Sequence, residues 1–176
     1  MKKVLVLSGS PRKGGNSDTL CDQFIKGAKE SGNFVTKIYI RDCKIGSCNA
    51  CYACKTSSIC VQKDDMTNIL QQMIDSDIIV LATPVYFYSM DGQMKTMIDR
   101  TLPRYTEIRG KDFYFIATAA AGKSSMERTI DSLRGFTDCL PTSHVKGVIY
   151  GAGAWQLGDI QGSKSMQEAY ITGKNA

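Results

Sequence analysis

The chain has 176 residues, 43% of them hydrophobic and 22% charged, which is the composition of a folded protein of about one domain at ~150 residues per domain. The net charge of +5 is scattered, and no basic run exceeds two residues, which argues against nucleic acid or a membrane surface as a partner. No apolar stretch approaches the ~18–20 residues of a membrane span, and the run at 4–7 is shorter than the ~7–15 residues of a secretion signal, so we expect a cytoplasmic protein.

Apolar runs and helical spacings alternate along the chain. Continuous apolar runs predict strands that are buried on both faces, at residues 4–7, 34–40, 77–82, 113–117 and 145–150. The third of these is expected to stop at Thr83-Pro84. Apolar residues at helical spacing predict helices near 20–32, 66–73, 94–102 and 124–139, with a weakly helical tail from 163. This order predicts an α/β fold with a parallel sheet and helices on both faces.

A cysteine-rich segment follows the second predicted strand. Residues 42–63 show no periodicity and are expected to form a long loop, which in a compact domain is typically functional. Four of the seven cysteines lie here, at Cys48, Cys51, Cys54 and Cys60. The odd total excludes a complete disulfide set within one chain, and the close spacing favours metal or redox chemistry. We expect residues 1–176 to form a single domain that carries this loop.

The loop after the first strand has the character of an anion site. Residues 8–17 (SGSPRKGGNS) connect a buried strand to a helix, where α/β sheets bind ligands. Glycines, the N–H groups of the helix start and Arg12 would favour a phosphate. The loop is neither a Walker A motif, because Gly15-Asn16 replaces Lys-Ser/Thr, nor the dinucleotide fingerprint G-x-G-x-x-G. A solvated turn, or a helix N-cap at Asn16 or Ser17, is the alternative.

Aromatic side chains follow the third predicted strand. Tyr86, Phe87 and Tyr88 stand in the loop of residues 83–90, and such a cluster is typical of a ligand or partner surface. In a sheet of strand order 2-1-3-4-5, this loop lies beside the first-strand loop at the switch point. The small residues 118–122 after the fourth strand would leave room for the edge of a flat ring. Aromatic packing at a subunit contact is the alternative.

These two loops resemble those of the NADPH-dependent FMN reductase group of flavodoxin-like proteins. The run Cys48-x2-Cys51-x2-Cys54-x5-Cys60 resembles the iron-sulfur flavoprotein branch of that group. The resemblance covers residues 2–118 well and the remainder loosely. It implies a flavodoxin-like, five-stranded parallel sheet of order 2-1-3-4-5 and one FMN per chain. By position, it implies phosphate contacts from Ser10, Arg12, Asn16 and Ser17, and contacts to the isoalloxazine ring from Pro84, Val85, Tyr86, Phe87, Ala119 and Gly122.

The resemblance also implies an activity and partners. The chain would be a flavin-dependent oxidoreductase in which FMN converts between two-electron and one-electron transfer. NAD(P)H or ferredoxin would donate the electrons and a small molecule would accept them. The assembly would be a homodimer or homotetramer with the flavin near a subunit interface. No side chain is assigned as a catalytic nucleophile or base.

Three interpretations of the cysteine run stay open. Its x2 spacings are those of a [4Fe–4S] ferredoxin run, and one segment would supply all four ligands of a cluster. Four thiolates also bind zinc, although structural zinc sites usually use two separated pairs. The third interpretation is metal-free cysteines, which would leave an NAD(P)H-dependent FMN or quinone-type reductase. A non-enzymatic electron carrier is a further alternative.

The remaining candidates are assigned structural roles. Cys21, Cys43 and Cys139 are expected in the core or on the surface, outside any metal site. The pair Asp99-Arg100 ends a predicted helix and is expected on a solvated face. Trp155 lies on a glycine-containing loop after the fifth strand, and the sequence leaves open whether it covers a neighbouring subunit.

Overall fold

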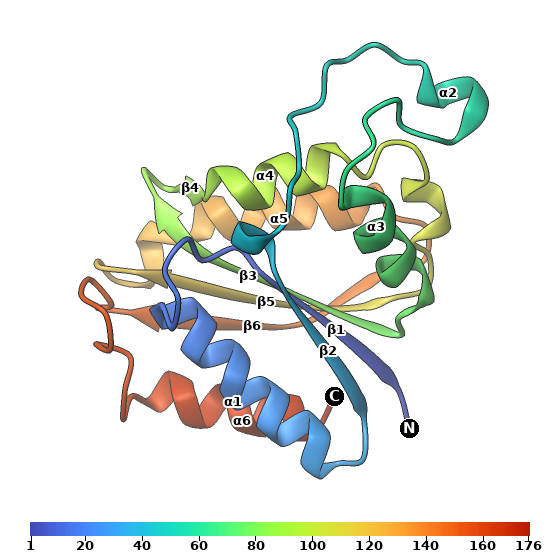
Figure 1. Cartoon of the computed structure of the whole chain (residues 1–176). Helices are drawn as coiled ribbons and strands as arrows, with labels where there is room; N and C mark the ends of the chain where they lie inside the picture. Colours follow the sequence, from blue (N-terminus) through green and yellow to red (C-terminus); the bar gives the residue numbers. More distant parts are fainter.

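The computed structural model describes all residues from 1 to 176, and a parallel sheet forms its centre (Figure 1). The five parallel strands are ordered β2-β1-β3-β5-β6, which is the predicted order. Their bounds are β1 Lys3–Ser8, β2 Phe34–Tyr39, β3 Ile78–Tyr86, β5 Asp112–Ala119 and β6 His144–Ala152. The flavodoxin-like α/β fold expected from the sequence is confirmed.

Helices cover both faces of this sheet, as Figure 1 shows. On one face lie α1 (Asn16–Glu30) and α6 (Lys164–Lys174); on the other lie α3 (Met66–Asp75), α4 (Gly92–Asp99) and α5 (Glu127–Asp138). Single turns complete the chain: η1 Ile40–Asp42, α2 Cys54–Ser57, η2 Tyr105–Glu107 and η3 Lys123–Ser125. None of the helices is both long and apolar enough to cross a bilayer.

The two faces of the sheet explain the continuous apolar runs. Along β1, Leu5 and Leu7 pack into the core beneath α3, α4 and α5, whereas Val4 and Val6 pack against α1 and α6. Because successive side chains of a strand point to opposite faces, a strand covered on both sides must be apolar throughout. This is the physical reason why the strands could be located from the sequence.

The helices α1 and α6 cross with their backbones in contact. A Cβ atom on Gly27 would collide with the Tyr170 carbonyl and lie 2.7 Å from the backbone nitrogen of Lys174. A Cβ atom on Gly173 would collide in the same way with the carbonyl of Phe24. The last helix of the chain is therefore fitted closely to the helix that follows the first-strand loop.

The third strand is longer than predicted. The expectation that it stops at Thr83-Pro84 is wrong, because β3 continues to Tyr86 and then turns back into β4 (Ser89–Met90). Its pairing with β1 ends at Ala82, so no strand lies on that side at Pro84 and the missing N–H leaves no bond unmade. Proline is thus tolerated where one side of the strand is free.

Candidate functional site

A cavity of about 410 Å³ opens at the carboxyl ends of the strands. This is where parallel α/β sheets bind their ligands, and the volume is typical of a cofactor site. Four segments line it: Ser10, Arg12 and Gly15–Ser17 after β1, Pro84–Phe87 at the end of β3, Thr118–Ala120 at the end of β5, and Ala154-Trp155 after β6. The cavity therefore joins the two loops singled out in the sequence.

The structure brings together every predicted flavin-contacting residue except Gly122. That residue lies beyond the end of β5, where its carbonyl accepts a hydrogen bond from Ser125 Oγ at 2.7 Å and the chain turns into η3. Thr118 and Ala120 also line the cavity and belong to the run 118–122 that was expected beside the ring edge, whereas Gly15 belongs to the first-strand loop but was not singled out as a contact. Trp155, for which the sequence suggested no role within its own chain, also lines the cavity.

Two serines of the first-strand loop are buried with their hydroxyl groups near the cavity. Ser10 Oγ donates to the Arg12 carbonyl at 3.0 Å and accepts from the Arg12 N–H at 3.2 Å. Ser17 is 1% exposed, and its Oγ has no hydrogen-bond partner. The N-cap of α1 is Gly15, so capping does not account for Ser17. A buried hydroxyl without a partner is unfavourable, and an oxyanion in the cavity would relieve it.

Asn16 holds the wall of the cavity instead of leaving its amide free. Its Nδ2 donates to the Gln156 carbonyl at 2.8 Å, and its Oδ1 accepts from the N–H groups of Gly158 and Ile160 at 3.2 and 3.4 Å. Arg12 Nη1 donates to the Trp155 carbonyl at 3.2 Å. These contacts join the first-strand loop to the segment 155–160, which we call the Trp155 loop.

Two buried carboxylates hold the loops beside the cavity in place by hydrogen bonds. Asp18 accepts from Ser8 Oγ at 3.0 Å and from the Gly14 N–H at 3.2 Å, and it pairs with Lys37 at 2.6 Å. Asp91 caps α4 and accepts from Thr83 Oγ1 at 2.7 Å. Burial raises the pKa of Asp91 above its usual value, although the bonds from Thr83 and from the helix N–H groups oppose this shift.

An aromatic turn closes one side of the cavity. Phe87 and Tyr88 connect β3 to β4 with φ angles of 50° and 61°, the left-handed region that a two-residue hairpin of type I′ requires. This conformation is strained for bulky residues, and such strain is common at ligand sites. Phe87 is fully exposed, and both Tyr86 and Trp155 are also exposed beside the cavity.

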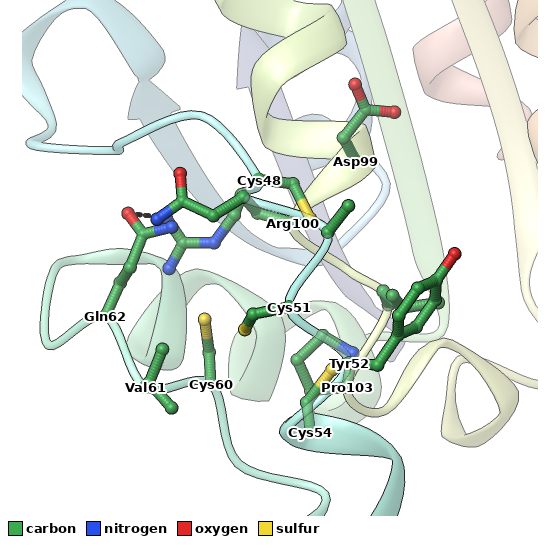
Figure 2. A pocket seen from close by; sticks show the side chains of 13 residues that line it. Cys48, Cys51, Tyr52, Cys54, Cys60, Val61, Gln62, Asp99, Arg100 and Pro103 are labelled. Carbon is green, nitrogen blue, oxygen red and sulfur yellow. Dashed lines mark hydrogen bonds between the residues drawn. The ribbon is translucent and has the colours of Figure 1, made fainter.

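The four cysteines of the run line a second, narrow pocket of about 20 Å³. It shares no residue with the first cavity and belongs to the loop that projects beyond α3 and α4 in Figure 1. Figure 2 shows the thiols of Cys51 and Cys60 facing the same space. All seven cysteines are free thiols, and no three potential ligands are gathered closely enough to hold a metal ion. Cys21, Cys43 and Cys139 lie outside this pocket, as expected.

Three non-glycine residues of the cysteine loop have positive φ angles. Ala50, Tyr52 and Ser58 all have φ between 51° and 58°, which non-glycine residues rarely adopt. Each lies within two residues of a cysteine of the run. Strained residues persist only where surrounding contacts enforce them, and they gather at functional sites.

Arg100 is the residue that sequence reasoning placed wrongly in this region. It was expected on a solvated face, but it is 2% exposed and lines the cysteine pocket, while its neighbour Asp99 is exposed. It forms a two-pronged ion pair with Asp64, at 2.7 and 3.0 Å. Burial acts to raise the pKa of Asp64, but the bonds from Arg100, Gly46 and Met66 outweigh it and hold the pKa below its usual value.

A doubly covered parallel sheet with a ligand cavity at its carboxyl edge defines a flavodoxin-like α/β protein. The family model described as NADPH-dependent FMN reductase matches residues 2–156. The chain therefore belongs to the NADPH-dependent FMN reductase family, a family of flavin-dependent NAD(P)H oxidoreductases whose cofactor is FMN.

Relatives agree with this assignment, and a solved structure shares the fold. An iron-sulfur flavoprotein of Archaeoglobus fulgidus is 44% identical over 103 residues, which is 58% of this chain but only 46% of that relative. An iron-sulfur flavoprotein of Methanocaldococcus jannaschii is 31% identical over 160 residues, covering 85% of this chain and 83% of the relative. An azoreductase structure from Bacillus anthracis superposes over the full length of both chains with a TM-score of 0.78 and 14% identity, which shows the shared fold.

Proposed function

We propose that this chain is an FMN-dependent oxidoreductase that also holds a [4Fe–4S] cluster, with Cys48, Cys51, Cys54 and Cys60 as its ligands. The observation that carries the proposal is that all four cysteines of the run line one pocket. Several relatives over most of the chain bear the name iron-sulfur flavoprotein, which supports the same assignment.

The residues of the larger cavity fit FMN. In our proposal, the phosphate lies at the first-strand loop, where Ser17 Oγ needs a partner and Arg12 supplies a positive charge. The ring lies against Pro84, Val85, Tyr86 and Phe87, and the small side chains of Ala119 and Ala120 leave room for its edge. Bound FMN would supply hydride and single-electron transfer. The protein binds and orients the ring, and Asn16 holds the Trp155 loop in place beside it.

The cysteine pocket fits a cluster by the chemistry of its donors. Four thiols are the ligand set of a [4Fe–4S] centre, and the buried cation of Arg100 would offset the negative charge of thiolates. Binding of a cluster requires the four thiols to move closer together, because no three potential ligands in this structure are close enough to hold a metal ion. A bound cluster would supply single-electron transfer to or from a partner such as ferredoxin.

We further propose that the chain acts as a homodimer or homotetramer with a small-molecule acceptor. Phe87, Tyr88, Trp155 and Leu157 expose large apolar surfaces around the cavity. Exposed aromatic surfaces of this kind favour contact with a partner or a flat substrate. NAD(P)H is the electron donor of the family, and ferredoxin is the alternative donor in the cluster-bearing form.

The second candidate function is a simple NAD(P)H-dependent FMN reductase with metal-free cysteines. This candidate is favoured by the spacing of the thiols, of which no three lie close enough to hold a metal ion. Rapid bleaching of the flavin by NAD(P)H without oxygen, in protein that contains no metal, would support this candidate. Slow bleaching together with fast reduction by ferredoxin would support the cluster-bearing enzyme. A stable one-electron-reduced flavin without turnover would indicate an electron carrier instead.

The deciding experiment is to measure iron, zinc and FMN per chain in protein purified without oxygen. About four irons and one FMN support the proposal, because a cubane cluster requires four irons. The Cys51→Ala variant should lose the iron and keep the FMN. The Cys139→Ala variant is the matched control, since Cys139 is exposed and lies outside the pocket. Zinc in place of iron, or FMN with no metal, would refute the cluster.

A further inference from the structure

We propose that Arg100 is a positioning residue for the cysteine loop. Its guanidinium ties the two ends of the loop together, and its free Nε–H serves as a hydrogen-bond donor to the metal-bound thiolates. The inference rests on the proposed cluster function and adds how the site is prepared and tuned.

The two ends of the loop are joined by a set of bonds that needs no metal. Lys44 N–H donates to Asp65 Oδ2 at 2.6 Å, and Asp65 N–H donates back to the Lys44 carbonyl at 3.1 Å. Gly46 N–H donates to Asp64 Oδ2 at 3.1 Å, and Gln62 Nε2 donates to the Ser47 carbonyl at 2.8 Å. Residues 44–47 and 62–65 therefore form a closed neck, and all four cysteines lie between them.

Arg100 joins both sides of this neck from a third element. It follows the last residue of α4, where the helix ends. Its Nη1 donates to the Gly46 carbonyl at 2.7 Å on one side and to Gln62 Oε1 at 3.1 Å on the other. Both carboxylate oxygens of Asp64 accept from its two terminal nitrogens. A planar guanidinium can reach these acceptors at once, with one Nη1–H shared between two of the three acceptors of Nη1, whereas the point charge of lysine cannot.

One nitrogen of Arg100 is left without a partner. Its Nε is buried and has no hydrogen-bond partner. The same side chain lines the pocket of the four cysteines, and Figure 2 shows it between Cys48 and Gln62 at the upper side of that pocket. A buried, unpaired N–H of a cation is unfavourable, so a site that contains one is suited to an anion. Thiolate sulfur bound to a metal is the anion that this pocket can provide.

Two consequences follow for metal binding. Closing a loop has an entropic penalty, and a neck that is already closed removes part of that penalty from the binding step. Groups that orient metal ligands typically contribute 10–100-fold to metal affinity. In addition, hydrogen bonds to the sulfurs of an iron-sulfur cluster are among the factors that set its reduction potential.

The test uses Co²⁺ as a probe of the full-length, FMN-loaded protein kept without oxygen. Absorption from thiolate to Co²⁺ reports how many cysteines bind, and a titration gives the affinity. The Arg100→Lys variant retains the charge but loses the fork and the Nε–H. We expect it to bind Co²⁺ about 10–100-fold more weakly than the wild type. Arg104→Lys is the matched control, because Arg104 pairs with Glu107 and Gln71 outside the neck.

A second variant separates closing the neck from donating to sulfur. A Cβ atom on Gly46 would collide with Gln62 Oε1, the end of a flexible side chain, so Gly46→Ala should displace Gln62 from Ser47 and Arg100 and thereby loosen the neck while Arg100 keeps its Nε–H. We expect both variants to lose Co²⁺ affinity. After loading with iron, only Arg100→Lys should shift the cluster midpoint potential to lower values. A purely structural Arg100 would leave that potential unchanged.

The outcomes distinguish this inference from the proposed function. If the wild type binds Co²⁺ through thiolates and Arg100→Lys binds it equally well, the role of Arg100 is refuted and the metal site stands. The same conclusion holds if Gly46→Ala and Arg100→Lys both leave the affinity unchanged. If the wild type shows no thiolate-bound Co²⁺ and takes up no iron, the metal site is refuted and the inference fails with it.

Discussion

Replacing Ser17 by alanine should have opposite effects on the empty protein and on cofactor binding. Ser17 Oγ is buried at the cavity and has no partner within the chain. The empty protein therefore bears the desolvation penalty of a polar group that gains nothing in return. Removing the hydroxyl should leave the free energy of unfolding unchanged or raise it, by up to about 1–3 kcal/mol.

The same change should weaken FMN binding. If Ser17 donates to the FMN phosphate, the variant loses a hydrogen bond to a charged group, which contributes about 1.5–3 kcal/mol. At about 1.4 kcal/mol per tenfold change, the dissociation constant for FMN should rise about 10–150-fold. Riboflavin lacks the phosphate, so its affinity should change little. Quenching of flavin fluorescence on titration into apoprotein measures both ligands, and urea unfolding measures stability.

A matched control exists on the other side of the molecule. Thr129 in α5 also has a buried hydroxyl without a partner, but it does not line the cavity. Thr129→Val should change stability in the same direction as Ser17→Ala and leave FMN affinity unchanged. The reasoning is refuted if Ser17→Ala binds FMN within twofold of the wild type, or if it destabilises the apoprotein by more than the control does.

Three further changes probe the phosphate, the helix crossing and the neck. Arg12→Gln should weaken FMN about tenfold or more but spare riboflavin in the same titration, and equal losses for both flavins would contradict a phosphate contact. Gly27→Ala should lower the free energy of unfolding in urea by about 1–3 kcal/mol, because its Cβ meets the Tyr170 carbonyl; an unchanged midpoint would contradict that contact. The lowered pKa of Asp64 means that its pair with Arg100 stabilises the fold fully above the unfolded carboxyl pKa of about 4 and loses this effect as the pH falls through the lower folded value. Asp64→Asn should remove this dependence from urea unfolding curves recorded down to about pH 2, and a parallel pH profile would contradict it.

The features that could be predicted from the sequence are those encoded by neighbouring residues. Strands covered on both faces read as continuous apolar runs, so β1 and β5 were found within two residues at each end. The first-strand loop and the residues at the end of β3 follow directly from their strands, and strand order then brings them to one cavity. The residues predicted at the strand ends therefore lie around one cavity, with Gly122 as the exception.

The features that were missed depend on contacts between distant residues. In the sequence, Arg100 is a charged residue at the end of an amphipathic helix, which predicts that it is exposed. It is buried because the cysteine loop packs over it. Asn16 looks like a phosphate ligand or a cap, yet its amide is used by a loop 140 residues further along. Proline usually ends a strand. Pro84 is tolerated in β3 because pairing with β1 has already ended at Ala82, and this is known only once the strands are assembled into the sheet.

The long sequence separation within the cavity wall has a consequence for biosynthesis. The first-strand loop emerges from the ribosome well before its partners Trp155, Gln156 and Gly158, which are made 140–143 residues later. Until they appear, the cavity lacks one wall and Asn16 lacks its bonds, and α1 still lacks the helix that packs against Gly27. The cavity is therefore complete only after residues 155–160 have been made, and a protein truncated before this loop would lack one wall of the cavity.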